Sequence, residues 1–198
     1  MKTIQFKTLL FCCFAALFFA SCNNDDDTSL TPEQRAAAFQ MVKGPHEGNM
    51  MYNDLTSTDP KDQVDTLRMT WNMQTDSTMV IYQFPASIIA ESITDDALKA
   101  AISKVEPRDL QCRTFFFNLD PVAFYISPIT LEYNLNYGEA DHKVQVVFYV
   151  NHPVSQGSYR TSTKFMSMQI VVAAIYIDGK QSEVLKNMVP FVFATDKK

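Results

Sequence analysis

Residues 131–150 read LEYNLNYGEADHKVQVVFYV, and this stretch indicates the fold more clearly than any other. Leucine and tyrosine alternate with polar residues over 131–137, so a strand there has one apolar and one polar face. The segment GEAD at 138–141 predicts a turn, and the apolar run 144–150 follows it. We therefore expect the two runs to pair as an antiparallel hairpin.

Runs of the same kind recur along the chain. Apolar and polar residues alternate over 67–73, which predicts a strand with one buried face, and 79–84 predicts its partner after a short turn. The apolar run 166–177 ends at Asp178-Gly179, a dipeptide that suits the positive backbone angles of a tight hairpin turn. The last run, 189–194, can pair back onto the sheet.

Two short helices are also expected. Thr31 is the N-cap of the first, because Pro32 occupies the first helical position and Gln34 completes a capping box. A second helix is predicted over 95–104, with Thr94 as its cap.

About eight strands and two helices, with no repeat and no second-domain linker, predict one mainly β domain over residues 31–198. Such a domain is either an antiparallel sandwich or a meander barrel. The pattern alone leaves open whether the sheet closes.

The N-terminus has the three parts of a lipoprotein export signal. Two lysines lie within the first seven residues, 8–20 is apolar apart from its first residue, and the small pair Ala20-Ser21 precedes Cys22. The apolar stretch has 13 residues, whereas a bilayer-crossing helix needs ~20. We predict that residues 1–21 are a signal peptide and that Cys22 carries diacylglycerol and a further chain by palmitoylation. The alternative is an ordinary signal peptide with a chance cysteine.

Residues 22–30 predict an acidic, flexible tether, because a polar stretch with nothing to bury cannot offset its ordering entropy. Cys22 followed by Asp25, Asp26 and Asp27 resembles the surface lipoproteins of Bacteroidetes-type bacteria, in which such an acidic run acts as a surface-export signal. The resemblance implies a lipid-anchored protein of the outer membrane that faces the cell surface. Alternatively, the three aspartates only keep the linker solvated.

The middle and end of the chain resemble an uncharacterised family of small lipoproteins of Bacteroides-type bacteria. The motifs that carry this resemblance are FP at 84–85, DDALK at 95–99, PVAF at 121–124, LNYG at 135–138, HKVQV at 142–146 and VPFVF at 189–193. The family is a domain of unknown function, so the resemblance implies a single domain and supplies no activity. The segment KGPHEG at 43–48 is more weakly similar to the start of calycin-like barrels, although it lacks the tryptophan often found there in lipocalins.

Charge and cysteine content narrow the classes of partner. Two of the 17 Lys and Arg residues lie in residues 1–21, which leaves 15 against 22 Asp and Glu, a net charge of −7. Binding to nucleic acid rests on cationic contacts to phosphate, so no nucleic-acid partner is expected, and neither is electrostatic adhesion to anionic lipid. After Cys22 the one remaining cysteine is Cys112. We therefore expect no intramolecular disulfide, and Cys112 should be a buried small hydrophobic residue.

Signatures of catalysis and metal binding are missing from the sequence. The three histidines, His46, His142 and His152, include no pair at ligand spacing, and the last two are expected in solvated turns. The chain has no Gly-x-Ser-x-Gly motif and no glycine-rich phosphate loop. We expect no metal, no cofactor and no enzymatic activity, with an uncharacterised enzyme as the alternative.

Two kinds of surface feature remain. The triplets Asp65-Thr66-Leu67 and Asp76-Ser77-Thr78 resemble the O-glycan acceptor of this bacterial group, which implies modification of Thr66 and Ser77. The triplet Phe115-Phe116-Phe117 puts rings on both faces of one strand. Exposed rings can anchor a protein partner or stack on a sugar, whereas core packing explains the same rings if both faces are buried.

These observations support three functional hypotheses. The first is a non-catalytic binding or surface-assembly module, anchored in the membrane through N-terminal acyl chains, whose partner is a surface protein or a glycan. The second is a barrel-like carrier of a small apolar ligand, with a cavity lined by residues such as Met69, Trp71, Tyr133 and Leu135. The third is an enzyme.

Overall fold

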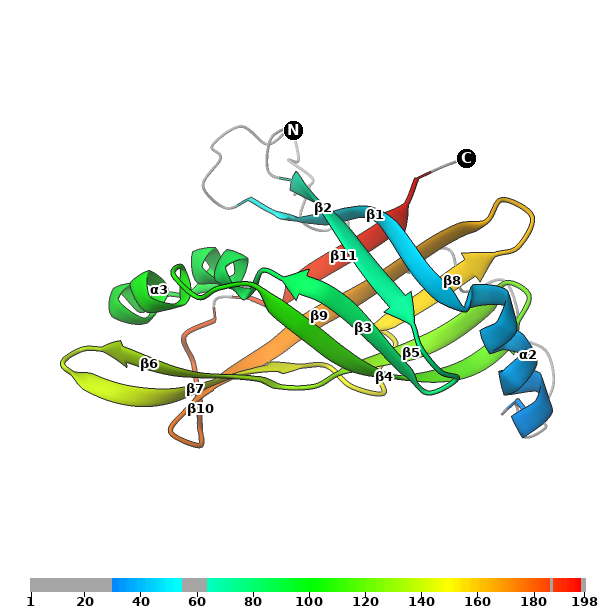
Figure 1. Ribbon diagram of the computed structural model, residues 1–198. Helices are drawn as coiled ribbons and strands as arrows, with labels where there is room; N and C mark the ends of the chain where they lie inside the picture. The colour runs from blue at the N-terminus through cyan, green and yellow to red at the C-terminus, as the bar shows by residue number, and fades with distance from the viewer. Residues whose placement is uncertain (1–29, 55–63, 186, 197–198) are drawn as a thin grey trace, which may run out of the picture.

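The computed structural model describes residues 30–54, 64–185 and 187–196, which form a mainly β domain (Figure 1). The strands in these ranges are β1 (Gly44–Asn53), β2 (Val64–Met73), β3 (Thr78–Phe84), β4 (Arg108–Leu119), β5 (Val122–Pro128), β6 (Leu131–Tyr137), β7 (Ala140–Phe148), β8 (Gln156–Arg160), β9 (Phe165–Ile177), β10 (Lys180–Ser182) and β11 (Val189–Thr195). The helices are α2 (Pro32–Val42), the 3₁₀ helix η1 (Ala86–Ser92) and α3 (Asp96–Ile102).

Eight antiparallel strands close into a barrel in the order β1, β2, β3, β4, β5, β8, β9 and β11. The last strand, β11, closes it, because β11 pairs with β1 on one side and with β9 on the other. Phe193 of β11, for example, lies opposite both Met50 of β1 and Met168 of β9. Of the two architectures that the sequence left open, the structure forms the barrel.

The hairpin of β6 and β7 lies outside this barrel and forms an extension beside it (Figure 1). The first half of β9 pairs with β8 as far as Gln169, and its second half, from Val172 to Ile177, pairs with β7. The long strand β9 therefore belongs to both the barrel and the extension. The helices η1 and α3 pack together next to β6, and Leu98 and Ile102 of α3 are fully buried there.

The turns agree with the sequence, with one difference in length. The turn between β6 and β7 consists of Gly138 and Glu139, whose φ angles are 57° and 68°. Such a two-residue turn matches the twist of the strands, and β7 begins at Ala140, earlier than the expected residue 144. Asp178 and Gly179, with φ of 51° and 78°, form the predicted turn that ends β9.

The helix caps confirm one prediction and correct another. In α2 the predicted capping box is present, because Thr31 Oγ1 accepts from the Gln34 main-chain N–H at 3.3 Å and Gln34 Oε1 accepts from the Thr31 N–H at 2.8 Å. In α3 the cap is Asp95, not Thr94, and its carboxylate accepts from the Leu98 N–H at 2.7 Å. A carboxylate at this position is also favoured by the helix dipole. Thr94 instead donates to a main-chain carbonyl outside the helix.

Large apolar side chains fill the inside of the barrel. Trp71 is fully buried, as predicted, and its indole N–H donates to the Met166 sulfur at 3.2 Å. Aromatic rings meet in three pairs with centroids 5.1–5.9 Å apart: Trp71–Phe193, Phe84–Phe191 and Phe116–Phe124. The same core includes six buried methionines: Met50, Met69, Met73, Met79, Met166 and Met168. Each such side chain contributes about 1.5–3 kcal/mol of burial free energy, so the interior is the main source of stability.

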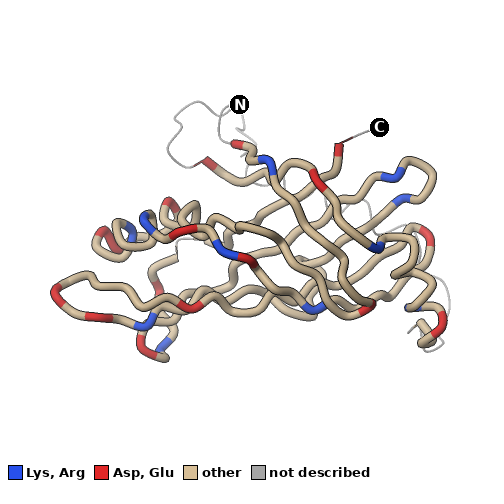
Figure 2. Tube along the Cα trace, in the orientation of Figure 1, with Lys and Arg blue, Asp and Glu red and all other residues tan. Residues whose placement is uncertain are grey.

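The outer side of the barrel wall carries the polar and charged positions of the same strands. In β4, buried residues alternate with exposed ones from Leu110 to Phe116. Lys and Arg are interspersed with Asp and Glu over the molecule (Figure 2). The period-two patterns of the sequence therefore distinguish the inside of the barrel from its outside.

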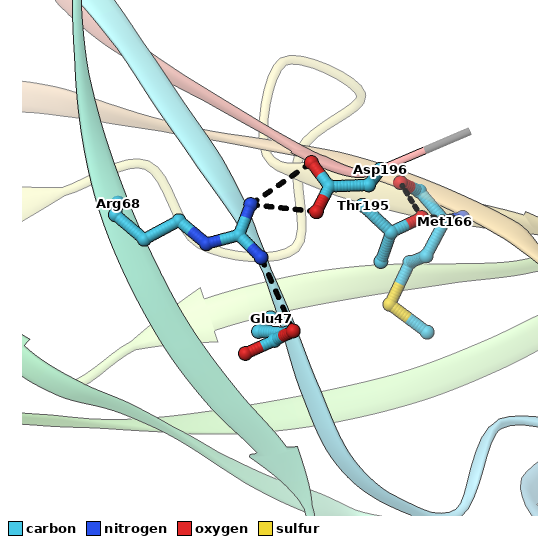
Figure 3. Close-up of polar contacts among 5 residues, drawn as sticks. All are labelled: Glu47, Arg68, Met166, Thr195 and Asp196. Carbon is cyan, nitrogen blue, oxygen red and sulfur yellow. Dashed lines mark hydrogen bonds and ion pairs between the residues drawn. The ribbon is translucent and has the colours of Figure 1, made fainter. Parts of the chain in front are cut away.

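Polar contacts across the seam of β1, β2 and β11 accompany the closure (Figure 3). Arg68 of β2 lies 2.7 Å from an Asp196 carboxylate oxygen and 3.2 Å from one of Glu47. Thr195 Oγ1 accepts from the Met166 main-chain N–H at 2.9 Å, which links β11 to β9. Arg68 and Asp196 are about half exposed, and exposed ion pairs contribute ~0–1 kcal/mol, so these charges add little to the closure.

Close backbone contact at Gly48 matters more. A Cβ atom placed on Gly48 would lie 2.0 Å from the Ala194 carbonyl oxygen and 2.8 Å from the Thr195 Cα. These atoms belong to the backbone at the β1–β11 pairing, so they cannot move away as the end of a flexible side chain can. Only glycine permits β11 to approach β1 this closely.

The substitution Gly48→Ala should therefore weaken the closure of the barrel. We expect the free energy of unfolding to fall by about 3 kcal/mol, because the added methyl group forces the backbones of β1 and β11 apart. Urea denaturation followed by tryptophan fluorescence measures this. The control is Asn49→Ala, an exposed neighbour, which should change stability by no more than about 0.5 kcal/mol. Equal effects of the two variants would contradict this account.

Cys112 is the buried small residue that the sequence predicted. It is 2 % exposed inside the barrel, and burial raises the pKa of its thiol well above the usual range. The thiolate is the reactive form of cysteine, so the folded protein should protect this group from thiol reagents.

We expect a chain of residues 30–198, in which Cys112 is the one cysteine, to resist labelling by Ellman's reagent at pH 8. In a denaturant that unfolds it, one thiol per chain should react. Absorbance of the released thionitrobenzoate follows both reactions, and rapid labelling of the folded protein would show that Cys112 is accessible.

Candidate functional site

Three aromatic rings lie together on the outer wall of the barrel, and we call Phe115, Phe117 and Tyr125 the aromatic surface. Phe116 is fully buried inside the barrel, whereas Phe115 on the other face is 41 % exposed. Phe117 and Tyr125 of the neighbouring strand β5 are half-buried and have ring centroids 4.5 Å apart. The Phe115-Phe116-Phe117 triplet thus supplies both the core and an exposed apolar group.

An irregularity in β4 shapes this surface. Phe116 pairs with Phe124 and Asn118 pairs with Ala123, so Phe117 is an extra residue between them. Such a bulge changes the direction of nearby side chains and increases the local twist. It brings the Phe117 ring against Tyr125.

Two arginines lie beside the aromatic surface. The guanidinium carbon of Arg35, on α2, is 5.6 Å from the centroid of the Phe115 ring. This contact arises because α2 packs along β4. Arg113 is exposed on the same outer face of β4, two residues before Phe115. The aromatic surface is therefore flanked by positive charge in a chain that is negative overall.

A shallow groove of about 360 Å³ lies where β4 begins and β5 gives way to β6. The Arg108 guanidinium stacks over the Tyr133 ring at 4.2 Å and donates to the Glu132 carbonyl oxygen at 2.9 Å. Burial raises the pKa of Tyr133, and its hydroxyl group has no hydrogen-bond partner among the described residues. Asp109 accepts from the Gln83 main-chain N–H at 3.0 Å. The charged groups of the groove are thus engaged in structural contacts.

His142 corrects a prediction. It is not a solvated turn residue but lies in β7, and its Nδ1 is 2.8 Å from an Asp178 carboxylate oxygen. The hydrogen bond with His142, followed by one from the Lys143 main-chain N–H, lowers the pKa of Asp178. The Tyr137 ring lies 4.5 Å from the imidazole. These contacts tie the turn after β9 to β7, which is a structural role.

The other two histidines lie elsewhere. His46 is in β1, with Nε2 2.7 Å from the Val42 carbonyl oxygen and its ring stacked on Trp71. His152 lies in the turn segment before β8, as predicted, and its Nδ1 accepts from the Val154 N–H at 3.2 Å. In the described part of the chain, no three His, Cys, Asp or Glu side chains lie close enough together to hold a metal ion.

The residues proposed to line a carrier cavity come from two strands, β2 and β6. Met69 and Trp71 are buried on β2 inside the barrel, while Tyr133 and Leu135 belong to β6 in the extension. Met69, Trp71 and Tyr133 all belong to one buried hydrophobic cluster, and Leu135 packs against it.

The predicted modification sites divide into two groups. Thr66 on β2 and Ser77 in the turn before β3 are both exposed. Cys22 and the aspartates Asp25, Asp26 and Asp27 lie outside the described residues. Among the helices that the structure describes, none has the length and apolar character needed to span a bilayer.

Sequence reasoning identified the Phe115–Phe117 triplet but not Arg35, Arg113 or Tyr125. Phe115 and Arg113 are exposed because buried and exposed residues alternate along β4. This alternation can be recognised in the sequence when residues 110–116 are considered together. The contact of Arg35 with Phe115 has no local signal, because a helix and a strand far apart in the chain make it.

Comparison with curated proteins and with solved structures gave no match. Residues 41–177 match the family described as "Domain of unknown function (DUF4840)". This range includes β1 to β9 and therefore both the aromatic surface and the hairpin of β6 and β7. Since the match spans more than half of the chain, the protein belongs to the DUF4840 family.

Proposed function

We propose that this protein is a non-catalytic binding or surface-assembly module that holds a protein partner on its aromatic surface. The observation that carries the proposal is the exposure of Phe115 on the barrel wall, beside Phe117 and Tyr125. Burying such rings against a partner releases water from apolar surface, and residues of this kind dominate the binding energy of interfaces.

A protein is favoured over a glycan by the way the rings are arranged. Arg35 lies over the Phe115 ring, and the Phe117 ring is tilted against Tyr125, so each ring has a neighbour that restricts stacking on a flat sugar. Arginine and aromatic residues together are typical of the buried centres of protein interfaces. The flanking charges of Arg35 and Arg113 fit a partner whose surface carries acidic groups around an apolar centre.

The packing of the barrel argues against the carrier hypothesis. Inside the barrel the Trp71 ring packs edge-on against Phe193, and Phe84 packs edge-on against Phe191, with centroids 5.9 and 5.1 Å apart. Rings that pack edge-on against one another occupy space that a carrier would keep for its ligand. The engagement of His142 with Asp178 and of Asp109 with Gln83 likewise favours a non-catalytic role over an enzyme.

The proposal includes lipid anchoring at Cys22, which rests on the sequence of the export signal. Acyl chains contribute about 0.8 kcal/mol per buried methylene, so the two or more chains of a mature lipoprotein hold it stably in a membrane. The run Asp25–Asp27 favours placement at the outer surface of the outer membrane, where a partner protein can reach the barrel. The proposal also includes O-glycans on Thr66 and Ser77, and both residues are exposed.

The aromatic surface can be tested by photo-crosslinking in intact cells. Replacing Phe115 with p-benzoylphenylalanine should yield a discrete crosslinked protein species on irradiation, because the benzophenone group reacts with the partner that covers it. Immunoblotting detects this species. The matched control places the same residue at Leu67 on β2, which is 39 % exposed.

Crosslinking of equal yield from positions 115 and 67, or none at 115, would refute a protein partner at this surface. A glycan partner would instead give a carbohydrate adduct in the crosslinked material, detected by periodate staining.

Lipid anchoring predicts a change in partitioning. The wild-type protein should enter the detergent phase of Triton X-114, and Cys22→Ser should move it to the aqueous phase because the acylated sulfur is lost. The control Cys112→Ser removes the buried cysteine and should leave the detergent partitioning unchanged. Wild-type behaviour of Cys22→Ser would exclude acylation as the source of membrane attachment.

A further inference from the structure

The strand β6 has a neighbour on only one side. It pairs with β7 through all seven residues, and it ends the sequence of paired strands that starts at β11. The hairpin of β6 and β7 projects beyond the barrel (Figure 1). Within the described part of the chain, β6 is the longest strand that pairs along one side only.

The register identifies which backbone groups face the open side of β6. Tyr137 and Ala140 flank a two-residue turn and form a hydrogen-bonded pair, so every second residue back to Leu131 also bonds to β7. The N–H and C=O groups of Glu132, Asn134 and Asn136 therefore point away from β7. The contact of Arg108 with the Glu132 carbonyl oxygen agrees with this assignment.

The remaining outward groups have no hydrogen-bond partner within the residues that the structure describes. These groups are the N–H of Glu132 and both backbone groups of Asn134 and Asn136. Because buried unpaired backbone groups are rare, they must face water or another chain.

The strand itself carries none of the residues or bulges by which proteins prevent pairing at an edge. No Lys, Arg or Pro occurs in Leu131–Tyr137, and the register with β7 contains no bulge. Charges, prolines and bulges are the usual protection of exposed edges. The single charge, on Glu132, is paired with Lys143 at 2.9 Å, so the edge presents little net charge to an approaching strand.

We propose that β6 pairs with β6 of a second copy of this chain, antiparallel about a two-fold axis at Asn134. In that register Asn134 lies opposite the partner's Asn134, and Glu132 lies opposite the partner's Asn136. Their outward N–H and C=O groups then exchange backbone hydrogen bonds in every pair. The Glu132 carbonyl oxygen has a second lone pair and can keep its bond to Arg108.

The side chains favour a second copy over an unrelated strand. On the apolar face Tyr133 meets the partner's Leu135, which is a favourable cross-strand pair. On the polar face no like charges oppose one another, because each Glu132 faces an amide. An isologous interface requires such self-complementarity, and the sequence Leu131–Tyr137 provides it.

The test compares sedimentation of the full-length protein in density-matched detergent with that of two variants. The wild type should reach the mass of a dimer as its concentration rises from about 1 µM to about 1 mM. Asn134→Pro should weaken the association at least tenfold, because it removes an N–H that faces the edge while leaving the bonds to β7 intact. Asn134→Ala keeps that N–H and should still dimerise.

Cysteine crosslinking keeps the test decisive if the proline variant does not fold. In native membranes Asn134→Cys should give a covalent dimer with a short bismaleimide, while Thr70→Cys, exposed on the barrel wall, should not. A wild type that stays monomeric, a proline variant that dimerises as well as the wild type, or an Asn134→Cys protein that crosslinks only to a different protein would each overturn the proposal.

Discussion

The pairing of β11 with both β1 and β9 is the constraint on which the rest of the structure depends. It joins residues near the two ends of the described chain, such as Gly48 and Thr195, and it completes the barrel. Without β11, β1 and β9 would have open edges and the interior around Trp71 would be exposed to water. The requirement is local and steric, because the backbones meet at a position that accommodates only glycine.

Closure of the barrel distinguishes its interior, its outer wall and the extension formed by β6 and β7. The inside of the barrel buries methionines and aromatic rings and supplies stability, so the outer wall is free to carry groups that stability does not need. Phe115 and Phe116 are adjacent in sequence, yet one is exposed and the other is buried, because alternate residues of a strand face opposite sides. The length of β9 then extends the sheet past the barrel, and the last strand of this extension, β6, pairs along one side only.

Much of the fold could be predicted from the sequence because its signals are local. The alternation over 131–137, the Asp178-Gly179 turn and the capping box at Thr31 each depend on a few neighbouring residues. The two wrong predictions concern a choice between adjacent residues for a helix cap and a contact between residues far apart in the chain. The N-cap of α3 is Asp95 and not Thr94. The sequence does not distinguish these two neighbours, because the side chain of either residue can accept a hydrogen bond from a helix N–H. His142 was misplaced because its partner, Asp178, is 36 residues away.

The sequence by itself determined which residues face inside and outside in the strands with clear alternation, where the main turns lie, and that the domain is mainly β. These properties follow from side-chain periodicity and turn chemistry, which act over a few residues. Only the tertiary structure decided that the sheet closes, that Arg35 covers Phe115, and that β6 stays at an edge. Each of these depends on segments far apart in the chain, and their contact is set by the packing of the whole barrel.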